Sequence, residues 1–393
     1  MSDGTDTGRR NGTAFAGRRR RGRCRSDASI ASRPASEPRC AAEVPISVVR
    51  GRHGTRSYAR VWYAPRGAYF PMESNSPYVG DMTGTETMRA VIARGYGGPE
   101  VLEVIEVPVP RPGPGQVLIR VRAATVNPVD LVTRSGALAA AGLMAPRAVT
   151  GIGWDVAGTI AATGPGVSAF SVGDTVIGLR DLLDRDLGCY ADYVVLDATA
   201  IAASDLPPVD AATLPLNGLT AHQALDLAAL APGDTVLITG AAGAVGGFAV
   251  EFAVRRRLRV VASASTSDES LLRDRGATWF VDRDITDPAT EVRRLIPGGV
   301  DGAVDTAGLG VRALAAVRTR GSFVTVVGGS APIPLRGIRV HEQWISADGP
   351  ALTALIREHP TLRVAGTLPL ERAREAHERM SAGGLRGRLV LVP

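Results

Sequence analysis

Three glycines are the residues whose type and spacing most directly suggest chemistry in this chain. Gly240, Gly243 and Gly246 recur at every third position, directly after the apolar run at 236–238. Glycine permits a tight turn and lets a phosphate approach main-chain N–H groups, and a following helix would direct its positive end at that phosphate. The spacing predicts a dinucleotide site at a strand–turn–helix junction. The residues expected to contact the cofactor there are Gly240, Ala241, Gly243, Ala244, Val245 and Gly246.

The strand expected at 259–264 indicates which dinucleotide would bind. An NAD site places an acidic residue at the end of this strand to hold the ribose hydroxyls. Here the strand ends among small hydroxyl side chains, Ser263, Ser265 and Thr266. Their presence favours the 2′-phosphate of NADPH, and Arg283 is the basic residue best placed to bind it. The alternative for Arg283 is an exposed surface charge.

Alternating strands and helices position these residues. This β-α repeat predicts a parallel, doubly wound sheet of the Rossmann type. Strands are expected at 235–239, 259–264, 278–282, 302–306 and 322–327, and helices at 244–256, 267–275, 287–296 and 310–318.

The part of the chain before this repeat has a different pattern. From Met88 to about position 206, short apolar strands alternate with Gly- and Pro-rich turns, which is typical of an all-β barrel-like domain. An amphipathic helix at 370–380 and a last strand at 388–392 are expected to return to this domain. We therefore predict an α/β protein with a barrel domain at 88–212 and 345–393 and a nucleotide-binding domain at 213–344.

Composition limits the possible functions. The chain has 393 residues, 45% hydrophobic, and its 45 basic residues are all Arg, so no lysine can be catalytic. Residues 1–87 contain 15 Arg and eight acidic residues, whereas 88–393 contain 30 Arg and 31 acidic residues. The globular part is thus nearly neutral, which makes nucleic-acid binding by it unlikely. Three cysteines without a CxxC pair argue against a disulfide framework or a structural zinc lobe, and no apolar run reaches membrane-spanning length. We expect a cytoplasmic protein.

The basic segment 1–87 has three interpretations. It could be a disordered arm that touches RNA or an acidic surface, or an Arg-rich organelle transit peptide. The third interpretation, which we favour, is upstream sequence included by a misassigned start, with translation beginning at Met72, Met82 or Met88.

Several motifs in order carry a family resemblance. VNPVD at 126–130, GWDVAG at 153–158, PLNGLTAHQAL at 215–225 and GAAGAVG at 240–246 resemble the zinc-independent medium-chain dehydrogenase/reductases, in the quinone oxidoreductase (zeta-crystallin-like) branch. The resemblance implies a GroES-like catalytic domain formed by both chain ends, with a Rossmann domain inserted. It also implies that NADPH and a small-molecule substrate meet between the two, and we expect a homodimer. The family often places a basic residue shortly after the second strand, where this chain has Asp268 and Glu269.

By the same resemblance, Asn127 and Thr220 line the nicotinamide site and are the candidate catalytic residues. They could donate hydrogen bonds to the oxygen on which negative charge develops. Their alternative roles are a turn residue before Pro128 and an ordinary helix hydroxyl. Relatives often carry a tyrosine at the position of Val132, so the proton could come from water. Asp305 and Gly328 end two strands at the edge where ligands bind. The segment Arg386–Arg388 resembles the family's closing strand motif, and its alternative role is a solvated turn before the last strand.

Zinc-dependent relatives carry a cysteine in the first motif and a histidine beside the acid of the second. Here these segments hold Asn127 and Trp154–Asp155, so we expect no catalytic metal. Asp130 and Asp155 are expected to be structural, because carboxylates would oppose a developing anion.

Three functions remain open from the sequence. The first is an NADPH-dependent reductase of quinones or α,β-unsaturated carbonyl compounds. The second is a trans-acting enoyl reductase of a polyketide or fatty-acid pathway, which would need an acidic carrier protein. The third is a non-catalytic NADPH-binding protein.

Overall fold

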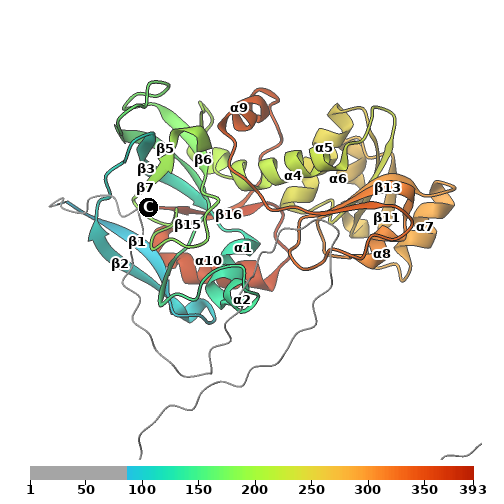
Figure 1. Ribbon diagram of the computed structural model, residues 1–393, viewed down its shortest axis with the longest axis horizontal. Coiled ribbons are helices and arrows are strands. Elements are labelled where there is room, and N and C mark those ends of the chain that lie inside the picture. Colours follow the sequence, from blue (N-terminus) through green and yellow to red (C-terminus); the bar gives the residue numbers. More distant parts are fainter. Residues whose placement is uncertain (1–85) are drawn as a thin grey trace, which may run out of the picture. The chain divides into compact units, whose positions relative to one another are not determined.

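A computed structural model describes residues 86–393, and the interpretations of segment 1–87 fall almost entirely outside the described residues. Two lobes, one built on a barrel and the other on a parallel sheet, share this part of the chain (Figure 1). None of its helices is long and apolar enough to cross a membrane.

The barrel lobe contains a three-stranded sheet, β2-β1-β4, and a seven-stranded sheet, β15-β16-β3-β5-β6-β8 with β7 paired to β3. The predicted last strand pairs antiparallel with β3, Val390 opposite Thr125, so the chain end does return to this lobe. The strands are β1 (Thr87–Arg94), β2 (Leu102–Pro108), β3 (Gln116–Thr125), β4 (Val149–Gly151), β5 (Asp155–Thr163), β6 (Thr175–Leu179), β7 (Tyr193–Asp197), β8 (Ile201–Ala203), β15 (Val364–Pro369) and β16 (Arg388–Val392). The helices are α1 (Pro128–Ser135), α2 (Ala137–Ala140), α3 (Pro208–Ala211) and α10 (Ala373–Ala382).

The second lobe is a six-stranded sheet of order β11-β10-β9-β12-β13-β14 in which every pair is parallel, as predicted for a Rossmann-type domain. Its strands are β9 (Thr235–Thr239), β10 (Arg259–Ala264), β11 (Trp279–Asp282), β12 (Val300–Asp305), β13 (Val317–Thr325) and β14 (Arg339–Glu342). Its helices are α5 (Ala244–Arg255), α6 (Glu269–Asp274), α7 (Pro288–Leu295) and α8 (Val311–Leu314).

Two details of this lobe differ from the sequence prediction. The helix expected at 310–318 ends at Leu314, because the chain from Val317 onwards joins the sheet beside Val300. Pairing with a neighbouring strand thus outweighs the helical pattern of this segment. The sequence analysis also missed β14, whose four residues are too few to show a period.

Helix α4 (Pro215–Ala228) lies between the lobes in Figure 1, and α9 (Gly349–Arg357) packs on it. One continuous apolar core contains Ile177 and Leu179 of the barrel, Leu219 of α4, and Ile238 and Val304 of the parallel sheet. The lobes are therefore packed together through α4.

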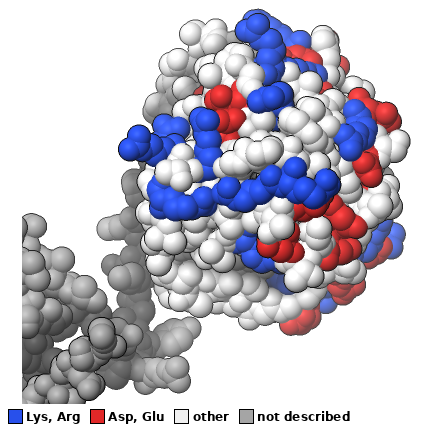
Figure 2. Space-filling view, turned by 90° about the vertical axis from the view of Figure 1, so that its right-hand side faces the viewer, with Lys and Arg blue, Asp and Glu red and all other residues white. Residues whose placement is uncertain are grey.

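Charged side chains of both signs share the face at the right of Figure 1, where a band of arginines runs beside acidic residues (Figure 2). Arg318, Arg320, Arg336 and Arg339 are exposed where β13 and β14 begin. Arg318 is paired with Asp301 at 2.8 Å. The acids beside the band fit the nearly neutral charge computed for residues 88–393.

A buried histidine in α10 makes the stability of the fold depend on pH. His377 is fully buried, its Nδ1 lies 3.2 Å from Nη1 of Arg134, and its Nε2 is enclosed without a partner. Burial, and then the charge of Arg134, lower the pKa of His377 to about 3. Since the unfolded chain binds a proton at this residue near pH 6.5, its contribution to stability is full above that pH and falls as the pH drops towards 3.

Replacing His377 with glutamine removes this titration and keeps an acceptor for Arg134. We expect the loss of unfolding free energy between pH 7.5 and pH 5 to be smaller by about 2 kcal/mol in H377Q than in the parent protein. Urea denaturation at the two pH values measures it, with exposed His359→Gln as the control. Equal pH dependence of H377Q and the parent protein would contradict the assignment.

Candidate active site

The glycine-rich turn joins β9 to α5 with the geometry that the spacing predicts. Gly240 has a φ of 58°, in the left-handed region, and Gly243 caps the helix that begins at Ala244. A Cβ on Gly246 would lie 2.2 Å from the carbonyl oxygen of Gly240, so only glycine fits where helix and turn meet. The first three helical residues, Ala244, Val245 and Gly246, have N–H groups without acceptors in their own helix. These features fit a bound pyrophosphate.

Arg363, which the sequence analysis did not identify, reaches this turn from the barrel lobe. Its guanidinium donates to the carbonyl oxygen of Ala242 at 2.9 Å and to that of Gly243. Burial, and then the charge of Arg275, lower its pKa to about 10. A cavity at the start of α5 is lined by residues of both lobes: Thr213, Ala244, Phe248, Thr361, Arg363 and Arg388. Because Arg363 and Ala242 are 121 residues apart in the chain, no local sequence pattern could have predicted this contact.

Of the hydroxyl residues at the end of β10, Ser263 is buried, Ser265 is half-buried and Thr266 is exposed. The hydroxyl of Thr266 donates to Asp282 at the end of β11. Arg283 follows, but its side chain is 65% exposed and its nearest carboxylate, Asp284, lies 3.6 Å away. The geometry of Arg283 therefore fits its alternative role, an exposed surface charge.

A different arginine reaches the loop after β10. Arg386, in the segment before β16, pairs with Asp268 and donates to Ser267 Oγ at 3.3 Å. Asp268, which stands where the family often has a basic residue, is thus paired with an arginine of the other lobe. This pair joins positions 118 residues apart, which no spacing rule connects.

The amide of Asn127 is fully committed to a buried network. The side chain is 0% exposed, and its Nδ2 donates to Asp155 Oδ2 at 2.6 Å and to Thr125 Oγ1 at 3.1 Å. Its Oδ1 accepts from Asn217 at 3.2 Å, and Asn217 in turn accepts from Arg388 at 2.6 Å. In this arrangement Asn127 positions its neighbours and has no donor left for a substrate.

Asp130 and Asp155 are fully buried and accept hydrogen bonds from the protein. Asp130 accepts from the main-chain N–H groups of Asn127 and Gly153 and from Tyr190, and Asp155 accepts from the N–H of Leu216 at 2.6 Å. Burial raises the pKa of Asp130 to about 7 and that of Asp155 to about 6. Their geometry matches the structural roles expected for them.

Thr220, in contrast, keeps its hydroxyl available. The residue is 8% exposed, and among the hydrogen bonds within 86–393 none uses its side chain. The oxygen is not among the fully enclosed atoms that lack a partner, so it reaches accessible space. Of the two candidate catalytic residues, Thr220 is the one able to donate to a ligand.

Asp305 and Gly328, the residues predicted to contact the cofactor at the ends of β12 and β13, also differ in whether they are available to a ligand. Asp305 is fully buried and accepts from Thr239 Oγ1 at 2.6 Å and the N–H of Gly310 at 2.8 Å, so its carboxylate braces the turn. Gly328 lies beneath the ring of Trp344, which a Cβ on the glycine would approach to 3.3 Å. Only the main chain of Gly328 is thus offered to a ligand.

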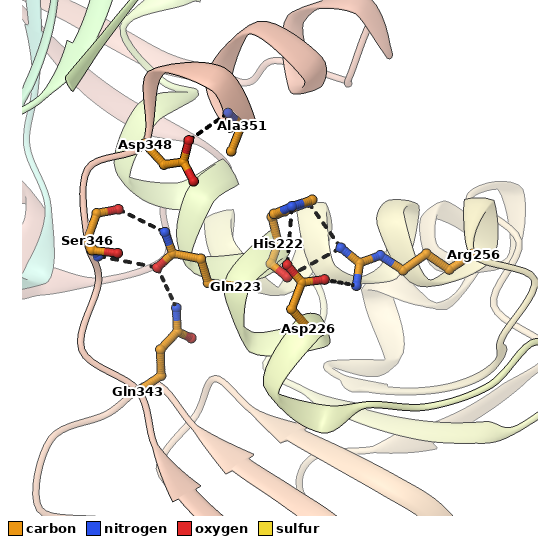
Figure 3. A network of polar contacts seen from close by, with 8 residues as sticks. All are labelled: His222, Gln223, Asp226, Arg256, Gln343, Ser346, Asp348 and Ala351. Carbon is orange, nitrogen blue, oxygen red and sulfur yellow. Dashed lines mark hydrogen bonds and ion pairs between the residues drawn. The ribbon is translucent and has the colours of Figure 1, made fainter. Parts of the chain in front are cut away.

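Polar contacts of α4 fix the segment that follows β14 (Figure 3). Gln223 donates to the carbonyl oxygen of Ser346 at 2.8 Å and accepts from Gln343 at 3.4 Å. On the neighbouring side of the helix, His222 and Asp226 bind Arg256, with distances of 3.0 and 2.6 Å. The helix that carries Thr220 is therefore held both to the end of α5 and to the connection between β14 and α9.

The side chains in the two motif segments do not fit a zinc ion. The amide of Asn127 is occupied, and Trp154 offers no ligand atom. Throughout the described residues, no group of three or more His, Cys, Asp and Glu side chains could hold a metal. Neither segment contains a histidine or a cysteine, and their carboxylates, Asp130 and Asp155, accept hydrogen bonds from the protein. The two segments thus lack the histidine and cysteine ligands that catalytic zinc usually has.

Comparisons with known proteins agree with this architecture. Residues 113–207 match the alcohol dehydrogenase GroES-like domain, and residues 275–391 match the zinc-binding dehydrogenase family. The quinone oxidoreductase of Lama guanicoe is 30% identical over 79% of this chain and 99% of its own length. The 2-methylene-furan-3-one reductase of Solanum lycopersicum is 29% identical, covering 78% of this chain and 79% of its own. A mycobacterial structure solved with NADPH has 31% identity and a TM-score of 0.66, covering 78% of this chain and all of that one.

The fold, the glycine turn and these matches define an oxidoreductase with GroES-like and Rossmann-like domains. The chain belongs to the medium-chain dehydrogenase/reductase family, and the quinone oxidoreductases are among its homologues, as the motif order predicted.

Proposed function

We propose that this protein reduces quinones or α,β-unsaturated carbonyl compounds with NADPH and without a metal. The observation that carries the proposal is the pairing of a glycine cradle at the start of α5 with an uncommitted hydroxyl on α4, Thr220. The names of the relatives and the NADPH of one of them support it.

The nicotinamide ring would supply a hydride to the β-carbon of an enone or to a quinone ring. In an enone, the C=C π pair would then form a double bond between Cα and the carbonyl carbon, and the C=O π pair would move to the oxygen, which leaves an enolate. Thr220 would donate a hydrogen bond to that oxygen, and water would deliver the proton. Asn127, through Asp155 and Asn217, positions the walls of the site.

The test of this function is an NADPH-oxidation screen across small quinones and enones. Turnover with either class is the expected result. Tight NADPH binding without turnover would instead favour the non-catalytic alternative, and activity confined to carrier-bound enoyl groups would favour the trans-acting reductase. One zinc ion per purified chain would contradict the metal-free mechanism.

Two arginines are candidates for the 2′-phosphate, and matched variants decide between them. We expect Arg386→Gln to weaken NADPH binding about tenfold and to leave NADH binding within twofold, because a charge-assisted contact is lost. Exposed Arg283→Gln should change neither value. Fluorescence titration measures all four affinities. The reverse pattern would assign the phosphate to Arg283, and equal NADH and NADPH affinities in the parent protein would remove the NADPH preference.

We also propose that the boundaries between the two domains fall near residues 212 and 345.

We further propose that two copies of the protein associate through the free edge of β14. Only one side of β14 is paired within the described residues, and two apolar side chains before it, Ile333 and Leu335, are 75% and 57% exposed. Light scattering of the intact protein tests the dimer. A monomer at micromolar concentration would contradict it.

A further inference from the structure

Arg180 is a buried cation that the sequence analysis and the proposed function leave unused. It follows β6 directly, and its main-chain N–H donates to the carbonyl oxygen of Trp154 at 2.8 Å. The residue is 8% exposed. It therefore lies beside the second motif, in the wall of the barrel lobe.

The guanidinium of Arg180 has no partner among residues 86–393. Within residues 86–393 it takes part in no side-chain hydrogen bond and no ion pair, whereas the other two buried arginines, Arg134 and Arg388, are bonded to His377 and Asn217. None of its nitrogens is among the fully enclosed atoms that lack a partner, so the group reaches accessible space.

Nearby groups do not neutralise this charge. Burial raises the pKa of the neighbouring Cys189 thiol to about 12, which keeps it uncharged. The two carboxylates whose charge acts on Arg180 are Asp184 and Asp186. Both are exposed, neither forms an ion pair with Arg180, and Asp186 pairs with Arg147. The guanidinium is therefore largely buried, lacks a protein partner and still reaches accessible space, so it is available to bind an anionic ligand.

Arg180 follows β6 on the side of the barrel lobe that packs against α4, the helix that carries Thr220. Leu179 and Trp154 belong to the core that spans both lobes, and α4, which carries Thr220, packs against β6. The side chain of Asp181, the residue after Arg180, accepts from the N–H of Ala347 at 2.8 Å. Ala347 follows Ser346, whose carbonyl oxygen accepts from Gln223 of α4 (Figure 3). Arg180 thus lies at the junction of the lobes, on the barrel side.

We propose that Arg180 binds a carboxylate of the substrate, so that the compounds reduced here are α,β-unsaturated carbonyl compounds that carry an acid group. A guanidinium binds a carboxylate through two parallel hydrogen bonds, which fixes both position and orientation. This inference rests on the proposed reductase function and narrows its substrate class. Hydride addition itself is unchanged, and the carboxylate keeps its charge throughout.

Two enones that differ at a single group test the proposal. 4-Oxopent-2-enoate carries a carboxylate where 3-penten-2-one carries a methyl group. We expect Arg180→Met to lower kcat/KM for the acid about 50-fold, with most of the change in KM, and to leave the neutral enone within about threefold. Arg94→Met, which removes an exposed arginine of the same lobe, is the control and should change neither value.

A binding measurement separates this proposal from the reductase function. Calorimetric titration of 4-oxopentanoate into the parent protein with NADP⁺ should show binding that R180M loses, even if no acceptor is turned over. R180M should melt no lower than the parent protein, because it removes an unpaired buried charge. Equal losses for both enones, unchanged binding of 4-oxopentanoate, or weaker NADPH binding in R180M would overturn the assignment.

Discussion

Gly246→Ala is expected to weaken NADPH binding at least about 100-fold, measured by fluorescence titration. The added Cβ would lie 2.2 Å from the carbonyl oxygen of Gly240, 2.7 Å from its carbonyl carbon and 2.9 Å from Cα of Ala241. All three are main-chain atoms, so neither a rotamer change nor a side-chain shift relieves the overlap. Helix α5 must move away from the turn, and the N–H groups that would hold the pyrophosphate then lose their alignment.

Gly113→Ala is the matched control for this variant. The nearest atom to its added Cβ is Oε1 of Gln116 at 3.2 Å, at the end of a flexible side chain far from the glycine turn. The control should bind NADPH as the parent protein does. If G246A bound NADPH within threefold of the parent protein while melting normally, the turn would not be the pyrophosphate site.

Asp155→Ala is expected to lower the free energy of unfolding by about 3–5 kcal/mol at neutral pH. The buried carboxylate accepts from Thr125, Asn127 and the N–H of Leu216. Its removal takes the acceptor away from three buried donor groups and removes a charge that offsets Arg388. Because Asn127 loses its anchor, turnover should fall as well, and the control Asp197→Ala, at an exposed position, should retain both properties.

The pH dependence of this loss has a defined sign. Burial raises the pKa of Asp155 to about 6, above its value in the unfolded chain. The folded state therefore holds more protons between about pH 4 and 6, and the parent protein loses stability from this group as the pH rises through that window. The alanine variant lacks that term, so its deficit in urea denaturation should be about 1 kcal/mol larger at pH 5 than at pH 7.5. An equal or smaller deficit at pH 5 would contradict the burial of an ionisable carboxylate here.

Local patterns were sufficient for much of the fold. The glycine turn, β9, α5 and β16 lie where sequence placed them, because each depends on residues close together in the chain. The period of the pattern was misleading at α8, where pairing with β12 decided the outcome, and β14 was too short to be seen.

The cofactor site shows the same division. The spacing of Gly240, Gly243 and Gly246 predicted by itself the turn and helix entry at which we propose that the phosphate binds, since turn and helix geometry are properties of adjacent residues. Which cations approach that site was decided by the tertiary structure. From the barrel lobe, Arg363 reaches the glycine turn and Arg386 reaches the loop after β10. Each contact joins residues more than 100 positions apart, so no local sequence pattern predicts it.

The sequence also determined the order of motifs, and with it the family, the two-domain architecture and the residue types available for chemistry. Only the tertiary structure showed that the amide of Asn127 is hydrogen-bonded to Asp155 and Asn217, whereas the hydroxyl of Thr220 is available. Only the tertiary structure showed that Arg180 is buried and lacks a partner in the part of the chain that the structure describes. Hydrogen bonding and desolvation depend on which distant segments pack together, so the availability of a group for catalysis cannot be deduced from its type and spacing alone.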